Sequence, residues 1–296
     1  MIGRPRPWRS LVLAAVALPL AVTVLYGRER SFPAPPQTER LLYLRSGKVA
    51  DRLMMSFDVI AADVYWIRAI QHYGRDLREF HPDRFGLLYP LLDLTTTLDP
   101  HFNIAYRFGA IFLAAPAPDG PGRTDLAIQL LRKGLAQNPT RWQYAHDIGF
   151  VHYWYTHDYA QAGEWFTRAA AMPNAPPWIQ PLAALTMAQG GDREGARVLL
   201  ENLARDASEE YIRNAALRGL AQLKALNAID QLQEIVEAYA SKHGGRYPGG
   251  WNDVFPGGAA PVDATGAPFV LDPKTHTVDV SPLSTLRPLP VVQRRR

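Results

Sequence analysis

The chain has 296 residues, of which 47% are hydrophobic and 20% are charged, so it is long enough to bury a core and is neither disordered nor fibrous. The net charge of +4 is small. Much of this positive excess lies at the two ends of the chain, and there is no basic stripe with interleaved aromatic residues, which argues against a nucleic-acid binder. The absence of cysteine excludes disulfides, thiol catalysis, thiolate metal sites and bacterial lipoprotein attachment.

An uncharged apolar run, Ser10–Tyr26, lies near the start of the sequence between flanking arginines. Its length of about 17 residues spans roughly 25 Å as a helix, which is within the range of a membrane-spanning segment. A cleaved signal peptide needs small residues at the two key positions after such a run; Val-Leu-Tyr-Gly-Arg does not provide such a pair, and the next alanine, Ala34, precedes two prolines. We therefore expect residues 1–30 to form an uncleaved membrane anchor, with a buried helix of a soluble protein as the alternative.

The arginines before this run favour a cytoplasmic amino terminus. That orientation predicts a single-pass protein of the bacterial inner membrane, with the bulk of the chain in the periplasm. Residues 31–40 contain three prolines and are expected to form a stiff, extended spacer.

Residues 41–243 have a helical pattern throughout, with apolar residues three and four apart and with glycine and proline at the boundaries. We expect one all-α domain over this range. Its first pair of helices is predicted at Val49–Tyr73 and Phe85–Leu98, and its last pair at Glu209–Ala225 and Ile229–His243.

A pattern recurs inside the helical domain: a small residue, a large apolar residue four positions later, and a third residue three positions after that. Its copies lie about 34–35 residues apart, at Ala127, Leu131 and Gly134; at Ala162, Phe166 and Ala169; and at Ala196, Leu200 and Leu203. The preceding helices also correspond, through Phe108-Gly109, Ile148-Gly149 and Ala183-Ala184. A regular period of this kind predicts stacked helical hairpins.

These residues resemble the tetratricopeptide repeat, which has Leu-Gly-x-x-Tyr on a first helix and Ala-x-x-x-Phe-x-x-Ala before a closing proline on a second. The resemblance implies a right-handed superhelix of helical hairpins whose concave groove binds a protein or peptide partner. An insert at Ala114–Gly122 lengthens one turn between helices. Residues expected in the groove lie on the first helices, away from the small packing residue: Asn103, Tyr106, Arg107, Gln143, His146, Phe150, Tyr153 and Trp178.

The stretch GFVHYWYTHDYAQAGEWF, Gly149–Phe166, combines aromatic residues with His152 and His157 and could be taken for an active site. His146 and His152 are six residues apart and so do not share a helix face, and no ligand triplet with the spacing of a metal site is present. We therefore expect no metal and no cofactor. His152 occupies the tyrosine position of the repeat and is predicted to be half-buried between helices.

Asp58 and Asp63 lie in an otherwise apolar helical segment, where a buried carboxylate needs a partner, for example Arg107. The sequence has no phosphate-binding glycine loop and no nucleophile elbow. These observations predict a protein that is not an enzyme. The alternative is a hydrolase that uses His146, His152 or Asp63.

Residues 244–296 are rich in glycine and proline, and Phe269–Leu271 and Thr277–Ser281 predict a small β-hairpin cap. A Tyr-Pro followed by Pro-x-Asp-x-x-Gly-x-Pro-aromatic over Pro261–Phe269 is similar to the closing segment of type II secretion pseudopilins. This resemblance implies envelope machinery, and it transfers no metal ligand. The final arginines predict a solvated tail.

The sequence thus predicts a membrane-anchored helical-repeat scaffold that mediates protein–protein interaction in the bacterial cell envelope, for the assembly of a secretion or pilus complex. It predicts no nucleic-acid partner. Besides the hydrolase, a periplasmic small-ligand or lipid binder remains open, and such a protein needs an apolar tunnel.

Overall fold

The structure is a computed structural model that describes residues 19, 23, 58–79 and 84–290. The expected anchor and the spacer therefore lie outside the described residues, apart from Pro19 and Thr23. Among the helices that are described, none has both the length and the apolar character needed to cross a membrane.

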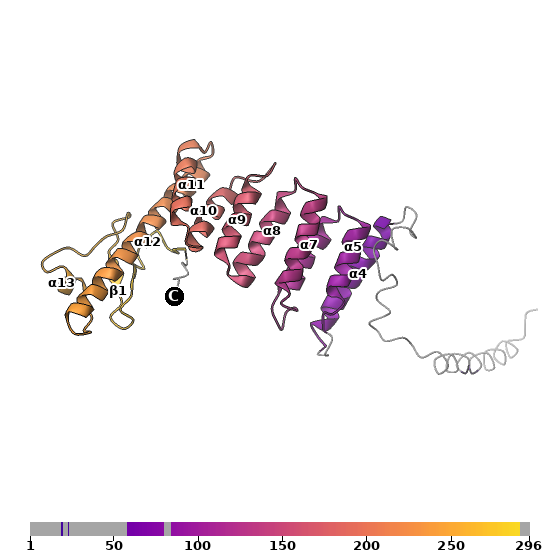
Figure 1. The fold of residues 1–296 in the computed structure, drawn as a ribbon, viewed down its shortest axis with the longest axis horizontal. Helices are drawn as coiled ribbons and strands as arrows, with labels where there is room; N and C mark the ends of the chain where they lie inside the picture. Colours follow the sequence, from indigo (N-terminus) through magenta and orange to yellow (C-terminus); the bar gives the residue numbers. More distant parts are fainter. Residues whose placement is uncertain (1–18, 20–22, 24–57, 80–83, 291–296) are drawn as a thin grey trace, which may run out of the picture.

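The described chain is mostly helical, and consecutive helices stack side by side into an elongated array (Figure 1). The array is followed by a long helix and by a short C-terminal segment with two strands. The helices of the array are α4 (Asp58–Asp76), α5 (Leu88–Leu98), α6 (Asn103–Ala114), α7 (Thr124–Gln137), α8 (Trp142–Val151), α9 (Tyr159–Ala170), α10 (Ile179–Gln189) and α11 (Arg193–Asp206). A single π-helical turn, η1 (His152–Thr156), extends α8.

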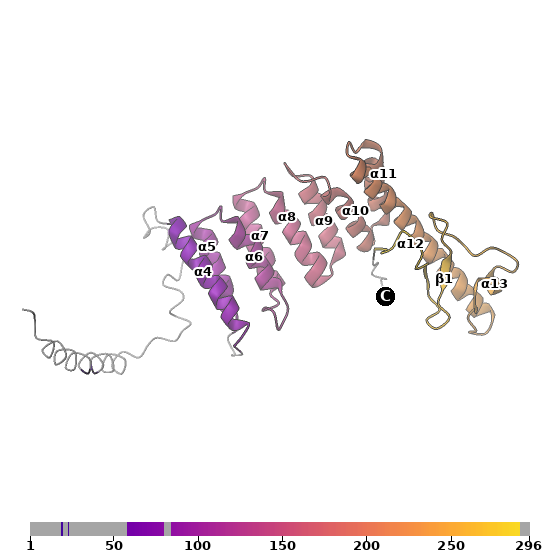
Figure 2. The ribbon, with the colours of Figure 1, turned by 180° about the vertical axis from the view of Figure 1, so that it is seen from behind.

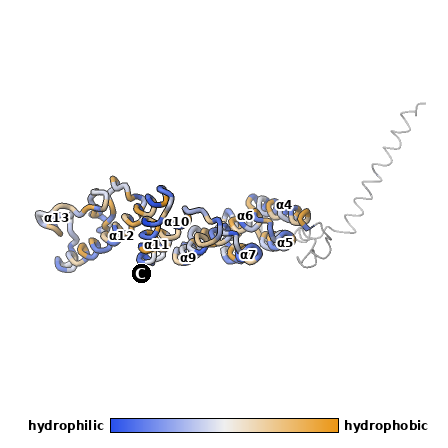
Figure 3. Tube along the Cα trace, turned by 90° about the horizontal axis from the view of Figure 1, so that it is seen from above, coloured by the Kyte–Doolittle hydropathy of each residue, from blue (hydrophilic) through white to orange (hydrophobic). Residues whose placement is uncertain are grey.

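The helices pack in sequential pairs, α4 with α5, α6 with α7, α8 with α9 and α10 with α11, and each pair also contacts the next. Seen from above, α4 and α6 lie in one row and α5, α7 and α9 in another (Figure 3). Trp66 of α4 stacks on Phe112 of α6, with ring centroids 6.2 Å apart, and α6 contacts α8 in turn. Such a domain of stacked helical pairs is what the 34–35-residue period predicts.

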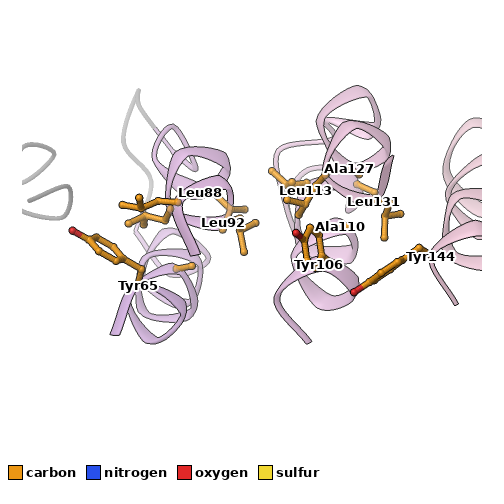
Figure 4. Packing of buried hydrophobic residues seen from close by; sticks show 14 of the residues in the cluster. Tyr65, Leu88, Leu92, Tyr106, Ala110, Leu113, Ala127, Leu131 and Tyr144 are labelled. Atoms are coloured by element: carbon orange, nitrogen blue, oxygen red, sulfur yellow. The ribbon is translucent and has the colours of Figure 1, made fainter. Parts of the chain in front are cut away.

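Small residues set the spacing between helices. A Cβ atom added to Gly149 would lie 2.6 Å from the Phe166 ring, and one added to Gly134 would lie 2.9 Å from the Tyr106 ring. Figure 4 shows Tyr106 beside Tyr144 among the buried residues that join successive pairs. Gly134 and Gly149 are therefore contact points at which an aromatic side chain of the paired helix fills the space that a larger residue would need, whereas leucines do so at Gly109.

Two irregular loops, the insert predicted at Ala114–Gly122 and the glycine-rich stretch Gly190–Gly195, lie between helices. Residues 115–123 join α6 to α7, so the proline-rich insert lengthens that turn as expected. The GGDREG stretch joins α10 to α11: Gly191 adopts a φ of +99°, and the Asp192 carboxylate caps α11 by accepting a hydrogen bond from the Gly195 N–H. Its glycines reverse the chain and cap helices.

The predicted last pair of helices is wrong. One continuous helix, α12 (Glu210–Lys242), replaces it (Figure 2). No glycine or proline interrupts the sequence between Ala225 and Ile229, so nothing there ends the helix. The second half of α12 buries its apolar side against the C-terminal segment, and no partner helix is needed for that side.

The C-terminal segment packs on α12 as a cap. It contains α13 (Trp251–Val254), β1 (Phe269–Leu271) and β2 (Val278–Val280), and the two strands pair antiparallel with Phe269 opposite Val280, as the predicted hairpin requires. Two buried glutamines of α12 hold it. Gln222 Nε2 donates to the carbonyl oxygen of Leu286 (2.8 Å), and Gln233 Oε1 accepts from the Val278 N–H (2.9 Å).

Asp263 organises the loop that carries the pseudopilin-like pattern. Its Oδ1 accepts hydrogen bonds from the backbone N–H groups of Thr265 (2.8 Å) and Ala267 (3.1 Å), and the Ser284 hydroxyl donates to Oδ2. Gly266 supplies the positive φ of +82° that the turn requires. The aspartate and the glycine of the pattern therefore have structural roles in this chain.

We predict that Gly149→Ala destabilises the protein by about 1–3 kcal/mol, because the added methyl group forces the Phe166 ring out of its position. Gly74→Ala is the matched control, since a Cβ atom at Gly74 of α4 meets no atom within 4 Å. That substitution should stabilise the helix by about 0.5–1 kcal/mol. Urea unfolding followed by circular dichroism measures both, and equal stability of the two variants would contradict the packing argument.

We predict that the cap loses stability in acid through Asp263. Burial acts to raise the pKa of this carboxyl, but hydrogen bonds from Ser284, Thr265 and the backbone outweigh burial and leave the pKa below its ordinary value. Its stabilising contribution is therefore complete above the unfolded pKa of about 3.9 and is lost as the pH falls through the lower folded value.

Amide hydrogen exchange over residues 261–286, measured with wild type and Asp263→Asn between about pH 7 and pH 2, tests this prediction. The variant should be less protected at neutral pH, and its protection should change less on acidification than that of the wild type. Asp206→Asn, at an exposed carboxyl on the end of α11, is the control. Identical acid profiles for wild type and Asp263→Asn would refute the role of this carboxylate.

Candidate functional site

The expected groove residues of α6 have different environments. Tyr106 is fully buried: it packs edge-on against Tyr144 at 5.3 Å, and its hydroxyl donates to the carbonyl oxygen of Thr96 (3.1 Å). Its predicted place in an open groove is thus corrected, because the side chain fills the junction between α6 and α8. Asn103 is half-buried at the start of α6, and its Oδ1 has no hydrogen-bond partner.

Arg107 links α6 to α8 through a bidentate ion pair. Its Nε lies 2.5 Å from Asp147 Oδ2 and its second guanidinium nitrogen 3.1 Å from Oδ1. The hydrogen bond to Asp147 raises the pKa of Arg107, and 41% of the arginine side chain remains exposed. The proposed pairing of Arg107 with Asp63 is wrong, because Asp63 lies exposed on α4.

His146 joins this ion pair to a cluster of rings. Its Nδ1 lies 3.0 Å from Asp147 Oδ1, and its ring stands edge-on to that of Trp178 at 5.6 Å. Trp142 meets both rings edge-on, at 6.0 Å from His146 and 6.3 Å from Trp178. Three of the expected groove residues, Arg107, His146 and Trp178, are thus linked through Asp147 and ring contacts in half-buried or exposed positions, and Gln143 is half-buried on the same helix as His146.

The π-helical turn η1 rearranges the aromatic stretch after α8. Phe150 stacks on Trp154 at 6.2 Å with an interplanar angle of 4°, whereas Tyr153 packs against Tyr159 at 5.2 Å. Trp154 is 60% exposed. Tyr153 is therefore a half-buried packing residue. The large exposed side chain of this stretch is Trp154, which the repeat pattern does not single out.

His152 begins the π-helical turn and is half-buried, as its place in the repeat predicts. Its Nδ1 has no hydrogen-bond partner, and burial lowers the pKa of the ring. A neutral, packed imidazole is the state that this environment favours. Among the described residues, no group of three or more side chains of the histidine or carboxylate type could hold a metal ion.

The sequence does not single out the exposed apolar residues of α4 and α6. Ile104, Phe108 and Ile111 of α6 are 52%, 51% and 42% exposed and share one helix face, because they follow one another at four and three residues. Ile60, Val64 and Ile67 repeat the same spacing on α4. Their i, i+4, i+7 spacing is visible in the sequence, but core residues of a helix have the same spacing, so the pattern alone does not show that these residues are exposed.

This surface lies opposite the helices of the second row. On α6, the residues that contact α5 and α7 are on the other side of the helix, where Gly109 meets Leu92 and Leu130. We call this surface the apolar face and define it by the exposed large apolar residues of three helices: Val59, Ile60, Val64, Ile67 and Ile70 on α4; Ile104, Phe108 and Ile111 on α6; and Trp154 with its stacked neighbour Phe150 beside α8.

The structure defines a helical domain of stacked sequential helices packed in pairs, with a small two-stranded cap. No protein-family model matches the chain, and comparison with curated proteins and with solved structures found no significant match. The class of the protein therefore rests on its architecture and on the surface described above.

Proposed function

We propose that this protein is a helical-repeat scaffold that binds an apolar segment of a partner protein along the apolar face. The observation that carries the proposal is the set of large exposed apolar side chains on α4 and α6, together with Trp154 in the turn that follows α8. Soluble monomers rarely expose contiguous apolar patches of this kind, and such patches mark interaction sites. Aromatic rings at one edge of the face, Phe150 and Trp154, are of the type that dominates binding energy at interfaces.

Charged and polar residues border the apolar face. Arg107 retains an exposed fraction beside Phe108, and Gln143 and His146 lie on α8, next in the row. A partner segment with a large apolar side and a polar edge fits this arrangement, because interfaces combine an apolar centre with a polar rim. The arrangement favours recognition over catalysis, since the histidine and carboxylate nearest to each other, His146 and Asp147, are engaged with Trp178 and Arg107.

The repeat belongs, in this proposal, to the tetratricopeptide type and winds into a right-handed superhelix. Support comes from the 34–35-residue period and from small residues at the helix contacts, such as Gly149 against Phe166. Residues 10–26 anchor the scaffold in the inner membrane, so that the domain works in the periplasm on an envelope assembly such as a secretion or pilus complex. The apolar run and the pseudopilin-like pattern support this setting.

We predict that Ile104→Ser combined with Phe108→Ser lowers capture of the partner at least about tenfold, because two central apolar contacts are lost. Pull-down from detergent-solubilised membranes, followed by identification of the captured protein, gives the measurement. Leu217→Ser with Leu283→Ser, at exposed apolar positions outside the apolar face, is the matched control and should capture the partner normally. Equal capture by both double variants, or no specific partner of the wild type, would refute the proposal.

We predict that a reporter fused after Arg296 and active only in the periplasm gives full activity when the whole chain is expressed in bacteria. A fusion that lacks residues 1–30 should be inactive, because the segment that exports and anchors the chain is gone. Activity of the full-length fusion in a cytoplasm-specific reporter format would overturn the membrane part of the proposal while leaving the scaffold part untouched.

A further inference from the structure

A separate cavity of about 750 Å³ lies at the other end of the molecule, between α12 and the cap. One wall is the side of α12 from Leu226 to Glu237, and the other is formed by β2 and by residues 287–290. The lining is partly apolar, with Leu226, Ile229 and Leu289, and partly acidic. This cavity is distant in the chain from the apolar face and has no part in the proposed scaffold function.

The acidic lining exceeds the basic lining. Of its four carboxylates, Asp230 pairs with Arg193 at 2.5 Å and Asp279 pairs with Arg287 at 2.6 Å. Within the part of the chain that the structure describes, no ion pair joins Glu234 or Glu237 to a cation, and the carboxylate of Glu237 accepts only a long hydrogen bond, from Gln233 Nε2 (3.4 Å). The cavity therefore presents two uncompensated carboxylates beside an apolar floor.

The chain continues from the wall of this cavity into a basic segment. Pro290 is the last described residue and lines the cavity, and the sequence Val-Val-Gln-Arg-Arg-Arg follows it as residues 291–296. Six extended residues reach about 20 Å, whereas α12 rises only about 10 Å from Asp230 to Glu237. The segment is thus longer than the stretch of α12 that carries these carboxylates, and it starts from a residue of the same lining, so the tether to Pro290 keeps its local concentration high.

We propose that residues 291–296 dock into this cavity, with the valines on its apolar floor and the arginines on Glu234 and Glu237. The order of residues in the segment supports this arrangement. The two valines follow the part of the wall that contains Leu289, and the arginines come after them. Arginine suits these carboxylates because its planar guanidinium forms paired hydrogen bonds with a carboxylate. This proposal replaces the solvated tail that the sequence alone predicts with a segment bound between α12 and the cap.

Photo-crosslinking of the full chain tests the proposal. Because the chain has no cysteine, Gln293→Cys provides a unique thiol for a benzophenone maleimide and leaves all three tail arginines in place. Irradiation followed by peptide mapping should place most crosslinks on residues 226–237 of the same molecule. Glu234→Lys with Glu237→Lys should lower that crosslinked fraction about tenfold, because two attractions become repulsions.

The matched control is Asp206→Lys with Glu210→Lys, which makes the same change in net charge at exposed positions outside the cavity. It should leave the crosslinked fraction unchanged, and circular dichroism should show native helicity for both double variants. Crosslinks scattered over the surface, crosslinks to a second copy of the chain, or an equal loss in both double variants would each overturn the proposal.

Discussion

The close approach of paired helices through small residues is the constraint on which the rest of the structure depends. At Gly149 and Gly134 the backbone of one helix lies against an aromatic ring of its neighbour, Phe166 and Tyr106 respectively. Each contact leaves no room for a methyl group, so it fixes both the distance between the helices and their rotation about their own axes. Because consecutive pairs use the same kind of contact, a local fit repeated along the chain produces an extended array.

That rotation decides which residues face solvent. On α6, with Gly109 turned toward Leu92 and Leu130, the residues Ile104, Phe108 and Ile111 are turned outward. An array of two helical rows cannot bury both sides of every helix. The side of each helix that is not buried in the array is available to a partner, and its composition therefore indicates what kind of partner it can bind. On α4 and α6 it is aliphatic, whereas exposed positions of α11 are largely charged, for example Glu194 and Arg197.

The sequence predicts the helical pairs well because their cause is local. A small residue followed four positions later by a large apolar residue is visible without any tertiary information, and α6 to α11 fall where this pattern lies. Side-chain direction within a helix is harder to predict. The sequence predicts Tyr106 in an open groove because it lies on a first helix, away from the small packing residue Gly109. A first helix, however, contacts its own partner, the previous pair and the next pair. The sequence does not indicate which of these neighbours covers a given side of the helix. In the structure, Tyr144 of α8 packs against Tyr106.

The error at α12 has a related cause. The apolar residues Ile229, Leu232 and Val236 indicate that one side of the helix is buried. If the chain is interpreted as a repeat, that side is expected to pack against a partner helix. In the structure the two strands of the cap, with Phe269 and Val280, cover that side instead. Period alone cannot distinguish the two partners, because a helix and a sheet both offer an apolar surface. The lack of glycine and proline at the expected turn is the feature of the sequence that indicates a continuous helix.

The two ends of the array differ in whether their apolar helix sides are covered, and this difference bears on the proposed function. At one end α12 and its cap close the stack with hydrogen-bonded glutamines and a hairpin, so that the last apolar side of the repeat is buried within the chain itself. Near the other end, α4 and α6 keep their aliphatic residues exposed. On the proposal that Ser10–Tyr26 anchors the chain, this exposed end is also the nearer one to the anchor in the sequence, because only residues 27–57 lie between the apolar run and α4. The same proposal therefore brings a partner that binds the apolar face near the bilayer.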